Sequence, residues 1–282
     1  MNLSADVIYG FATSLLSKRF DNPQPTPDFH YEMWQYCCDE HPQVAIAAPR
    51  GHAKSTAITH SYVLASVLFR SSSYVIILSD TEGQVVQFLN DIKMELLENE
   101  ELRHLFQVRK FVKESETDLI VELGPDNHKF RIQARAAGTS LRGLKWRGKR
   151  PDLVVGDDLE NDESVMNEDR RAKFRQWFYG ALVPALSDKG KIRIVGTILH
   201  FDSLLERLMP ATTGEEMQYT HKQGLRDWSV KNEPEWKSVK YRAHSDFDDF
   251  SEILWPEKFD EKRLKRQRND YIRQGYPEGY SQ

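Results

Sequence analysis

The residues best suited to chemistry stand in one short loop, residues 50–56, with the sequence RGHAKST. An apolar run precedes this loop, and a helical pattern follows it to about residue 69. A strand that leads into a loop and then into a helix beginning with Lys-Ser is the arrangement of a phosphate-binding loop, in which backbone N–H groups and the helix N-terminus face the phosphates. We therefore predict that Lys54 contacts the β- and γ-phosphates of a nucleotide and that the Ser55 hydroxyl binds Mg²⁺. The predicted nucleotide-binding residues of the loop are Arg50, Gly51, His52, Ala53, Lys54, Ser55 and Thr56.

The loop departs from the usual phosphate-binding pattern at Ala48 and Ala53, where that pattern has glycine. Glycine is favoured at such positions because it adopts positive φ and lets the backbone approach a ligand closely. Alanine is the least disruptive replacement, so we keep the prediction of a nucleotide site. The alternative is an alanine-rich core strand followed by a solvated lysine.

A second group of candidates follows the apolar strand predicted over residues 152–156. Asp157, Asp158 and Glu160 come directly after it, and a strand that delivers carboxylates at its C-terminal end is the second half of a phosphate-loop site. We predict that Asp157 holds Mg²⁺, directly or through water, and that Asp158 is the general base that polarises the attacking water. Because Asp158 is shorter than the glutamate more common at this position, Glu160 is the alternative base. An acidic turn that merely closes a strand is the structural alternative.

Three further side chains are candidates for the same site. A strand predicted over residues 192–196 ends in Gly196-Thr197, which would place the Thr197 hydroxyl near the γ-phosphate or the attacking water. Gln35, upstream of the loop, is predicted to bind the adenine edge through its amide. Arg50, four residues before Lys54, is predicted to stabilise the charge that grows on the transferred phosphoryl group.

Residues 129–150 contain eight arginines and lysines and no acidic residue, although the whole chain has a net charge of −4. Arg142 and Arg147 lie in the part that leads to the carboxylate strand. One interpretation is an arginine finger that reaches the nucleotide of a neighbouring subunit, because a planar multidentate donor suits phosphate. The other is contact with a DNA backbone, and the sequence does not decide between them. We interpret a second basic cluster, residues 262–268, as a solvated face.

The elements that must position these residues alternate between helical patterns and short apolar strands. This alternation predicts an α/β fold with a mainly parallel sheet covered by helices on both faces, and ligands of such sheets bind beyond the carboxyl ends of the strands. A hairpin joins residues 119–122 to 129–133. Helices are predicted over residues 3–16, 29–39, 56–69, 82–99, 168–186 and 256–274, and strands over residues 44–47, 74–79, 152–156, 192–196 and 238–243.

Composition bounds the kind of protein. The chain has 282 residues, of which 39% are hydrophobic, which is enough for a sizeable core at this length. No apolar run approaches the roughly 20 residues that span a bilayer, and the N-terminus does not have the pattern of a signal peptide, so we expect a soluble, intracellular protein that does not bind membranes. The only two cysteines, Cys37 and Cys38, are adjacent and suit neither a loop-closing disulfide nor a metal site.

Taken in order, four motifs resemble the ATPase half of the large terminase subunit of tailed bacteriophages, the motor that packages DNA. The resemblance runs from about residue 29 to the end of the chain. The motifs are RGHAKST at residues 50–56, LRG at 141–143, RPDLVVGDDLE at 150–160 and VGTILH at 195–200, with LWPEKF at 254–259.

This resemblance implies a P-loop NTPase of the additional-strand, catalytic-carboxylate class. It implies an ATPase core over residues 1–200, and a lid subdomain with a C-terminal helix over residues 201–282 that leads to a nuclease domain absent from this chain. The functional positions of the family fall on Arg50, on Asp158 as the catalytic carboxylate and on Gly196-Thr197 as the coupling motif. Nuclease activity is therefore not expected here.

The same resemblance implies the cofactors and partners. ATP and Mg²⁺ are the expected cofactors, and double-stranded DNA is the molecule that the motor is expected to translocate. The expected protein partners are the portal protein, the small terminase subunit and further copies of the chain in a ring, usually a pentamer. The expected location is the cytoplasm of the host cell during virion assembly.

Two other functions compete with a DNA-translocating ATPase. A nucleic-acid remodeller of the superfamily 2 type would keep the nucleotide site but needs a second RecA-like lobe, for which the roughly 80 residues after His200 are too few. A catalytically inactive DNA-binding or assembly module would explain the alanines in the loop.

Overall fold

The computed structural model describes residues 3–19, 23–209, 226–227 and 236–280. Within these residues the chain forms a nine-stranded sheet in the order β3-β4-β5-β2-β6-β7-β1-β9-β8. The strands are β1 (Gln43–Ala47), β2 (Tyr74–Ser79), β3 (Val108–Glu114), β4 (Asp118–Leu123), β5 (His128–Ala136), β6 (Leu153–Asp157), β7 (Lys191–Gly196), β8 (Arg226–Asp227) and β9 (Lys237–Tyr241).

The centre of the sheet is parallel. Strands β5, β2, β6, β7, β1 and β9 run in the same direction, whereas β3, β4 and β8 pair antiparallel at the two edges. Strand β7 lies between β1, which leads into residues 50–56, and β6, which leads into the carboxylates. This inserted strand confirms the predicted additional-strand class of α/β P-loop fold. It also brings the carboxyl ends of β1, β7 and β6 together at one edge.

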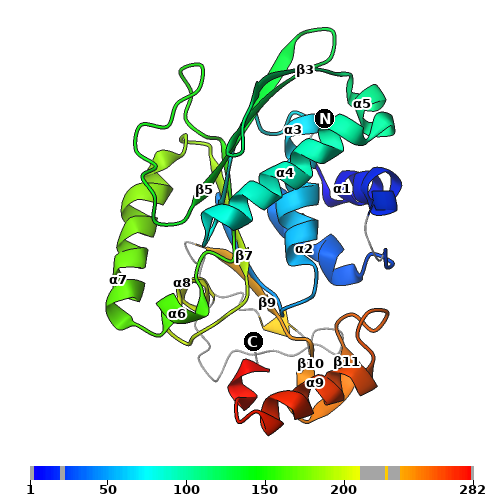
Figure 1. Ribbon diagram of the computed structural model, residues 1–282, viewed down its shortest axis with the longest axis vertical. Coiled ribbons are helices and arrows are strands. Elements are labelled where there is room, and N and C mark those ends of the chain that lie inside the picture. Colours follow the sequence, from blue (N-terminus) through cyan, green and yellow to red (C-terminus); the bar gives the residue numbers. More distant parts are fainter. Residues whose placement is uncertain (1–2, 20–22, 210–225, 228–235, 281–282) are drawn as a thin grey trace.

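Helices cover both faces of the sheet (Figure 1). Because successive side chains of a strand point to opposite faces, Val44 and Ile46 of β1 join one core and Ala45 and Ala47 join the other. The first core packs under α1 (Ala5–Phe11), η1 (Ala12–Leu16), α2 (Asp28–Cys38), η3 (Thr56–Tyr62), α3 (Val63–Leu68), α4 (Glu82–Glu98) and α5 (Glu100–Phe106). The second packs under α7 (Glu168–Trp177), η4 (Phe178–Leu182), η5 (Val183–Ala185) and α8 (Leu204–Leu208).

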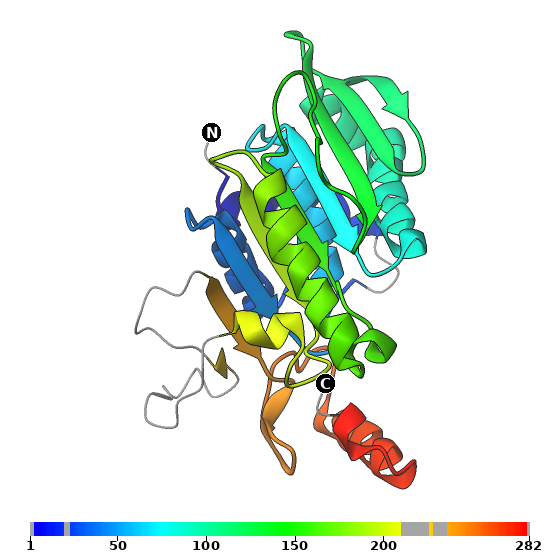
Figure 2. The same ribbon diagram turned by 90° about the vertical axis from the view of Figure 1, so that its left-hand side faces the viewer.

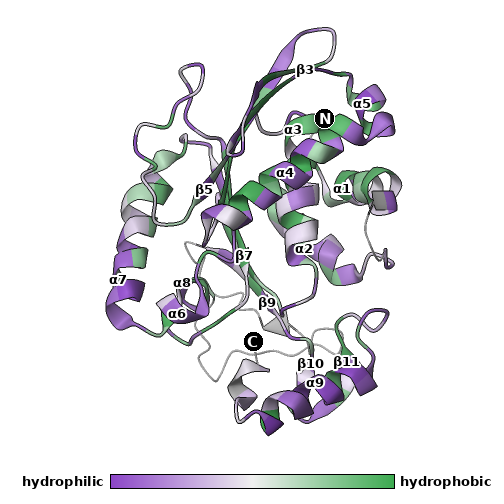
Figure 3. Ribbon diagram, in the orientation of Figure 1, coloured by the Kyte–Doolittle hydropathy of each residue, from purple (hydrophilic) through white to green (hydrophobic). Residues whose placement is uncertain are grey.

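Hydropathy follows this layering. The central strands and the inward sides of their helices are apolar, while polar residues cover the outer helices (Figure 3). Burial of these two apolar layers is the main favourable term for the fold, since stability scales with the apolar area removed from water. No helix in the described part of the chain is both long and apolar enough to cross a membrane.

The last part of the chain forms a small body beyond the carboxyl ends of the strands (Figure 2). It consists of the hairpin β10 (His244–Asp246) and β11 (Asp249–Ile253), helix α9 (Glu261–Arg273) and the short turn η6 (Pro277–Gly279). Helix α9 begins later than the predicted residue 256, because the Asp260 side chain accepts a hydrogen bond from the Arg263 N–H and caps the helix there. Residues 255–259 instead form a turn against the core, which we call the strap.

Most predicted elements are present with ends shifted by a few residues. The structure adds α5 and the edge strand β3, which the sequence pattern did not indicate, and most of the polar stretch at residues 211–236 lies outside the described residues. The predicted division between core and lid at residue 200 stays a prediction. Strand β9, which follows it, pairs in parallel with β1 and so belongs to the core sheet.

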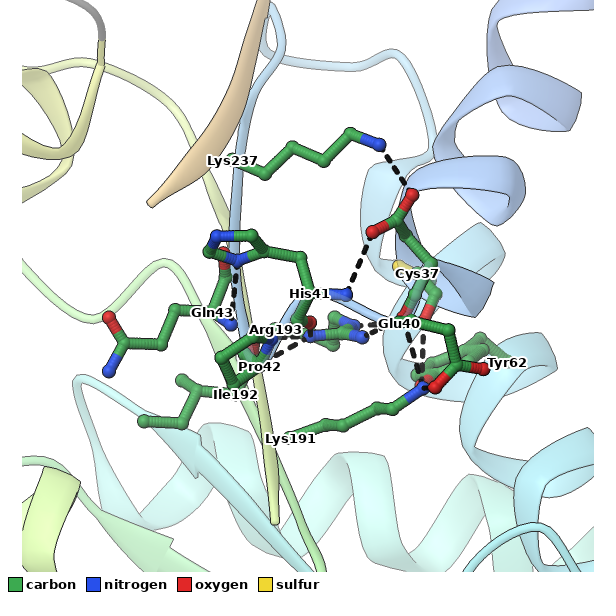
Figure 4. Close-up of polar contacts among 11 residues, drawn as sticks. Cys37, Glu40, His41, Pro42, Gln43, Tyr62, Lys191, Ile192, Arg193 and Lys237 are labelled. Carbon is green, nitrogen blue, oxygen red and sulfur yellow. Dashed lines mark hydrogen bonds and ion pairs between the residues drawn. The ribbon is translucent and has the colours of Figure 1, made fainter. Parts of the chain in front are cut away.

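One buried cation fixes the entry to strand β1 (Figure 4). Arg193, on β7, is 1% exposed, and its guanidinium donates to the carbonyls of residues 37, 39, 41, 42 and 192 at 2.8–3.2 Å. These carbonyls belong to the end of α2, to the turn that follows it and, for residue 192, to β7 itself. Because Arg193 is satisfied almost entirely by backbone, it ties the end of α2 to the amino end of β1.

Candidate nucleotide-binding site

The phosphate loop spans residues 48–55, between β1 and η3. Ala48 N–H donates to the Gly196 carbonyl at 2.9 Å, so the loop leaves the sheet beside the end of β7. Gly51 has φ +77° and Ala53 has φ +54°. Ala53 therefore adopts the left-handed conformation that the glycine of the usual pattern would supply, at a cost of about 1–2 kcal/mol for an L-residue. The loop geometry is formed despite the alanine.

Lys54 connects the three predicted motifs. Its side chain is almost fully buried, and its Nζ donates to Thr197 Oγ1 at 2.8 Å and lies 3.3 Å from Asp158 Oδ2. Thr197 Oγ1 in turn lies 3.3 Å from the Ala48 carbonyl. Residues from β1, β6 and β7 thus converge on one ammonium group, as expected where the carboxyl ends of parallel strands meet.

Asp158 is held in a constrained conformation beside the lysine. Its φ is +43°, and its Oδ1 accepts a hydrogen bond from the Thr197 N–H at 2.8 Å. A Cβ at Gly196 would lie 3.0 Å from this oxygen, so the glycine permits the close approach. About 39% of the Asp158 side chain is exposed, which leaves its other oxygen accessible to a water molecule as well as to Lys54.

Asp157 lies beneath the loop and is fully buried. Its Oδ2 accepts a hydrogen bond from Thr59 Oγ1 at 2.5 Å, but its Oδ1 is buried without a partner among the described residues. Burial and the neighbouring Asp158 carboxylate raise the pKa of Asp157 to about 6, against the opposing effect of the Thr59 and Ser55 hydroxyls, which favour the charged form. A buried carboxylate of which one oxygen has no partner in the described part of the chain fits a divalent cation.

The donor set fits Mg²⁺ better than a metal held by protein alone. Among the described residues no group of three or more histidine, cysteine or acidic side chains is arranged to hold a metal ion. Mg²⁺ is usually held by one or two protein oxygens together with nucleotide phosphates and water. Ser55 and Asp157 would supply two such oxygens, and their role as Mg²⁺ ligands stays a prediction. Thr59, four residues after Ser55 on the same helix, supports the carboxylate.

Glu160, the alternative base, is engaged elsewhere. Its Oε2 accepts a hydrogen bond from the Leu204 N–H at 2.7 Å, at the start of α8, and burial raises its pKa above the usual range. Glu160 therefore serves the helix that follows the Gly196-Thr197 motif. The geometry favours Asp158 as the base.

Comparison with known proteins finds similarity in structure but not in sequence families. No protein-family model and no curated protein matches the sequence. The structure is similar to the ATPase domain of the Thermus phage P74-26 large terminase, with a TM-score of 0.58 and 15% identity over 89% of this chain and 92% of that one. It is also similar to the HK97 bacteriophage large terminase, with a TM-score of 0.59 and 13% identity over 95% of this chain and 52% of that one.

The chain has the fold of a large terminase ATPase domain. This confirms, at the level of fold, the resemblance indicated by the order of the motifs. The chain spans about half of the HK97 large terminase, which is longer than an ATPase domain.

Arg50 lies at the rim of the site in this terminase fold. Its Nη2 pairs with the Asp162 carboxylate at 3.0 Å, where α6 (Asp162–Val165) begins, and about half of each side chain is exposed. An ion pair of this kind in water is worth at most about 1 kcal/mol. The pair is therefore weak enough to exchange for a phosphate, and the predicted catalytic role of Arg50 stays a prediction.

Among the described residues, Gln35 has no hydrogen bond to the loop. It lies on the exposed face of α2, more than a turn beyond His30, and close to the end of the helix that Arg193 holds. His30 of α2 forms a hydrogen bond with the loop, since its Nε2 lies 2.8 Å from the His52 carbonyl. The sequence signal for His30 was present in the same aromatic segment, but the interpretation chose the amide. The adenine contact of Gln35 is untested and gains no support from its position.

Arg142 and Arg147 also lie away from the phosphate loop of their own chain. Arg147 has φ +52° in a turn next to Trp146, and the Trp146 ring packs edge-on against Tyr74 at 6.1 Å. Tyr74 begins β2, so Arg147 stands near the amino ends of the strands, about one strand length (~20 Å) from the site.

Arg142 lines a hollow of about 250 Å³ together with Lys145, Arg150 and Pro184. Both Arg142 and Arg147 are exposed, and neither has an acidic partner among the described residues. In the part of the chain that the structure describes, neither arginine has a hydrogen bond or an ion pair with the phosphate loop, Asp157 or Asp158. The two interpretations that remain are action on a neighbouring subunit and contact with DNA.

Proposed function

We propose that this chain is the ATPase motor domain of a phage large terminase, and that it couples Mg²⁺-dependent ATP hydrolysis to the movement of double-stranded DNA into a procapsid. The observation that carries the proposal is the meeting of Lys54, Asp158 and Thr197 within 3.3 Å contacts above a buried Asp157. The terminase fold supports it, because that fold places the same three strand ends together.

The residues present can perform hydrolysis. Lys54 and the loop N–H groups bind the β- and γ-phosphates and neutralise their charge. Asp158 orients a water molecule and takes its proton as the water oxygen bonds to the γ-phosphorus and the bond to the β–γ bridging oxygen breaks. Ser55 and Asp157 would hold Mg²⁺, which supplies additional positive charge to the phosphate oxygens when bound.

Thr197 is suited to report the state of the nucleotide. Its hydroxyl accepts from Lys54 and its N–H donates to Asp158, so both its polar groups depend on the two residues nearest the γ-phosphate. The segment that follows runs to α8, whose first N–H groups are held by Glu160. Loss of the phosphate would therefore change the contacts of Thr197 at the start of this segment.

The partners follow from the same proposal. Double-stranded DNA, a portal protein, a small terminase subunit and a ring of further copies, usually a pentamer, would complete the motor in the host cytoplasm. The exposed Arg142 and Arg147 support a ring, because an exposed arginine without an acidic partner among the described residues can serve a neighbour's nucleotide. The inactive-module alternative loses its main support, since Ala53 adopts the required positive φ.

Phosphate release from ATP tests this function. The chain is assayed with Mg²⁺ over a wide range of protein concentration, beside Lys54→Ala and Asp157→Ala. We expect turnover that both substitutions abolish and that rises faster than linearly with protein concentration, because a neighbouring arginine completes the site. If turnover is linear in protein concentration, the arginine finger acts within its own subunit or is not part of this chain.

Two outcomes would replace the proposal. Nucleotide binding without turnover, even with DNA and at high concentration, would favour the inactive assembly module. ATP-dependent strand separation without movement along a closed duplex would favour the remodeller.

A further inference from the structure

The strap, residues 255–259, packs against the side of the phosphate loop that lies toward the lid. Lys258 Nζ donates to the Gly51 carbonyl at 2.7 Å, and the Phe259 ring stacks on the His52 ring at 4.5 Å with an interplanar angle of 20°. These contacts join positions 207 residues apart in the sequence. The LWPEKF motif of the sequence thus has a defined place beside the loop, which the hydrolytic mechanism does not use.

Three successive carbonyls of the loop accept hydrogen bonds from side chains. The Arg50 carbonyl lies 3.0 Å from His52 Nδ1, the Gly51 carbonyl accepts from Lys258, and the His52 carbonyl lies 2.8 Å from His30 Nε2. Since a carbonyl can only accept a hydrogen bond, Nδ1 of His52 and Nε2 of His30 must each carry a proton in these contacts. A phosphate loop binds anions through its N–H groups. Hydrogen bonds from side chains to the loop carbonyls hold the loop in the conformation in which these N–H groups are available.

The packing around His52 is tight. His52 is 2% exposed, and its ring is enclosed by Phe29, Trp255 and Phe259 at centroid distances of 4.5–6.5 Å. A Cβ at Gly51 would lie 3.2 Å from the Phe259 ring. The ring of Phe259 therefore leaves room for a glycine at position 51, where the loop adopts positive φ, but would crowd a residue with a side chain.

Lys258 is held in place by its own surroundings. Its ammonium lies over the rings of Trp255 and Phe259, at 4.7 and 5.6 Å from their centroids. Contacts of a cation with aromatic faces are favourable, more so when they are partly desolvated. A hydrogen bond from an ammonium to a carbonyl is stronger than one between neutral groups.

We propose that Lys258 and Phe259 are positioning residues of the phosphate loop. From the lid side they hold the Gly51 carbonyl and the His52 ring, and so preorganise the loop N–H groups for phosphate. The inference rests on the proposed function in so far as the phosphate is that of a nucleotide. Because the strap and the phosphate engage the same loop, each favours the binding of the other by the same factor.

Calorimetric titration with Mg–ADP and with Mg–pyrophosphate tests this inference. Lys258→Met and Phe259→Leu are compared with the unchanged chain, and Lys258→Arg tests rescue by another cation. Lys262→Met, an exposed lysine of the same subdomain, is the matched control. We expect the Kd of both ligands to rise about tenfold in the two strap variants, as for the loss of a charge-assisted hydrogen bond, and to stay unchanged in the control. Lys258→Arg should recover most of the affinity.

Three results would overturn the inference. Equal affinity in Lys258→Met and the unchanged chain would leave the proposed function intact but remove the role of the strap. Weaker binding of ADP alone, with pyrophosphate unaffected, would mean that the strap contacts the nucleoside instead of shaping the loop. Failure of the unchanged chain to bind either ligand would overturn the proposed function and this inference together.

A second measurement needs no substitution. The N–H groups of Lys258 and Phe259 donate to the Trp255 carbonyl at 3.2 and 2.9 Å, which closes the turn of the strap. If the strap and phosphate support each other, amide hydrogen exchange in residues 255–259 should slow when Mg–pyrophosphate binds to the unchanged chain. Unchanged exchange at saturating pyrophosphate would contradict the proposal even if the strap variants did not fold.

Discussion

The two ends of the neighbouring strands β1, β7 and β6 hold buried charge in different ways. At the amino end, Arg193 is surrounded by five carbonyl oxygens that it satisfies. At the carboxyl end, Asp157 is as deeply buried, but one of its oxygens has no partner in the part of the chain that the structure describes, and Ala53 and Asp158 adopt positive φ. Backbone strain and an unsatisfied charge are unfavourable unless a ligand compensates them. The comparison separates a cluster that stabilises the fold from one arranged for binding.

The largest expected effect is on hydrolysis. Lys54→Ala removes the ammonium that contacts Thr197 and Asp158, and we expect ATP turnover to fall by about a thousandfold or more. Lys191→Ala is the matched control, because Lys191 donates to a carbonyl at the opposite end of the same sheet. A comparable loss of turnover in Lys191→Ala, measured by phosphate release, would erase the distinction between the two ends.

The next effect is on stability. Arg193→Met keeps most of the side-chain volume but removes the donors of five carbonyls, and we expect the free energy of unfolding to fall by about 2–4 kcal/mol. Denaturant unfolding measures this change. Arg50→Met, at the exposed rim of the site, should change the stability by less than about 1 kcal/mol. Equal losses in the two variants would show that Arg193 has no special structural role.

A smaller effect concerns Thr59. Thr59→Val keeps the shape but removes the hydroxyl that binds Asp157, and we expect the affinity for Mg²⁺ in the presence of ADP to fall about tenfold, as for other groups that orient metal ligands. Thr59→Ser should retain it. Ser66→Ala removes a buried hydroxyl that bonds only within its own helix and serves as the control. The measurement is the affinity for ADP as a function of Mg²⁺ concentration. We expect the affinity for ADP without Mg²⁺ to stay unchanged.

The pH dependence of Asp157 has a definite sign. Because its pKa is raised to about 6 in the folded chain, the native state binds more protons than the unfolded state between about pH 4 and 6. The contribution of Asp157 to stability is therefore present at low pH and lost as the pH rises through 6. Asp157→Asn should remove this slope and raise the melting temperature of the ligand-free chain at pH 7.5, while abolishing Mg²⁺-dependent turnover. If Asp157→Asn melts at the same temperature as the unchanged chain at pH 7.5, or at a lower one, the burial assigned to Asp157 is contradicted.

The smallest effect tests the loop itself. Ala53→Gly relieves the positive φ of Ala53 but adds flexibility to the unfolded chain, and we expect the two to leave a net stabilisation of about 1 kcal/mol or less. Thermal unfolding measures this difference, and turnover should remain within about twofold. A marked loss of stability would mean that the Ala53 methyl makes contacts that outweigh the strain.

The sequence was sufficient to predict the part of the site that depends on strand ends. Lys54, Asp157 and Thr197 each follow an apolar strand, and the geometry of a parallel sheet brings such positions together. It did not identify Thr59, whose role depends on which face of η3 meets β6. The roles of Lys258 and Arg193 depend on contacts between segments more than 150 residues apart. The contact of His30 with the His52 carbonyl was also not predicted, because the direction in which α2 presents its side chains is set by tertiary packing.

The order of the strands has a consequence for how the chain is made. Strand β1 is the first to be synthesised, but both of its neighbours, β7 and β9, come from residues 191–196 and 237–241. Strand β1 therefore has no partner on either side until β7 is complete at residue 196, and it has a partner on only one side until β9 is complete at residue 241. Unpaired strand edges invite association between chains. A nascent chain, or a fragment that stops before residue 237, would therefore expose one edge of the strand that carries the phosphate loop.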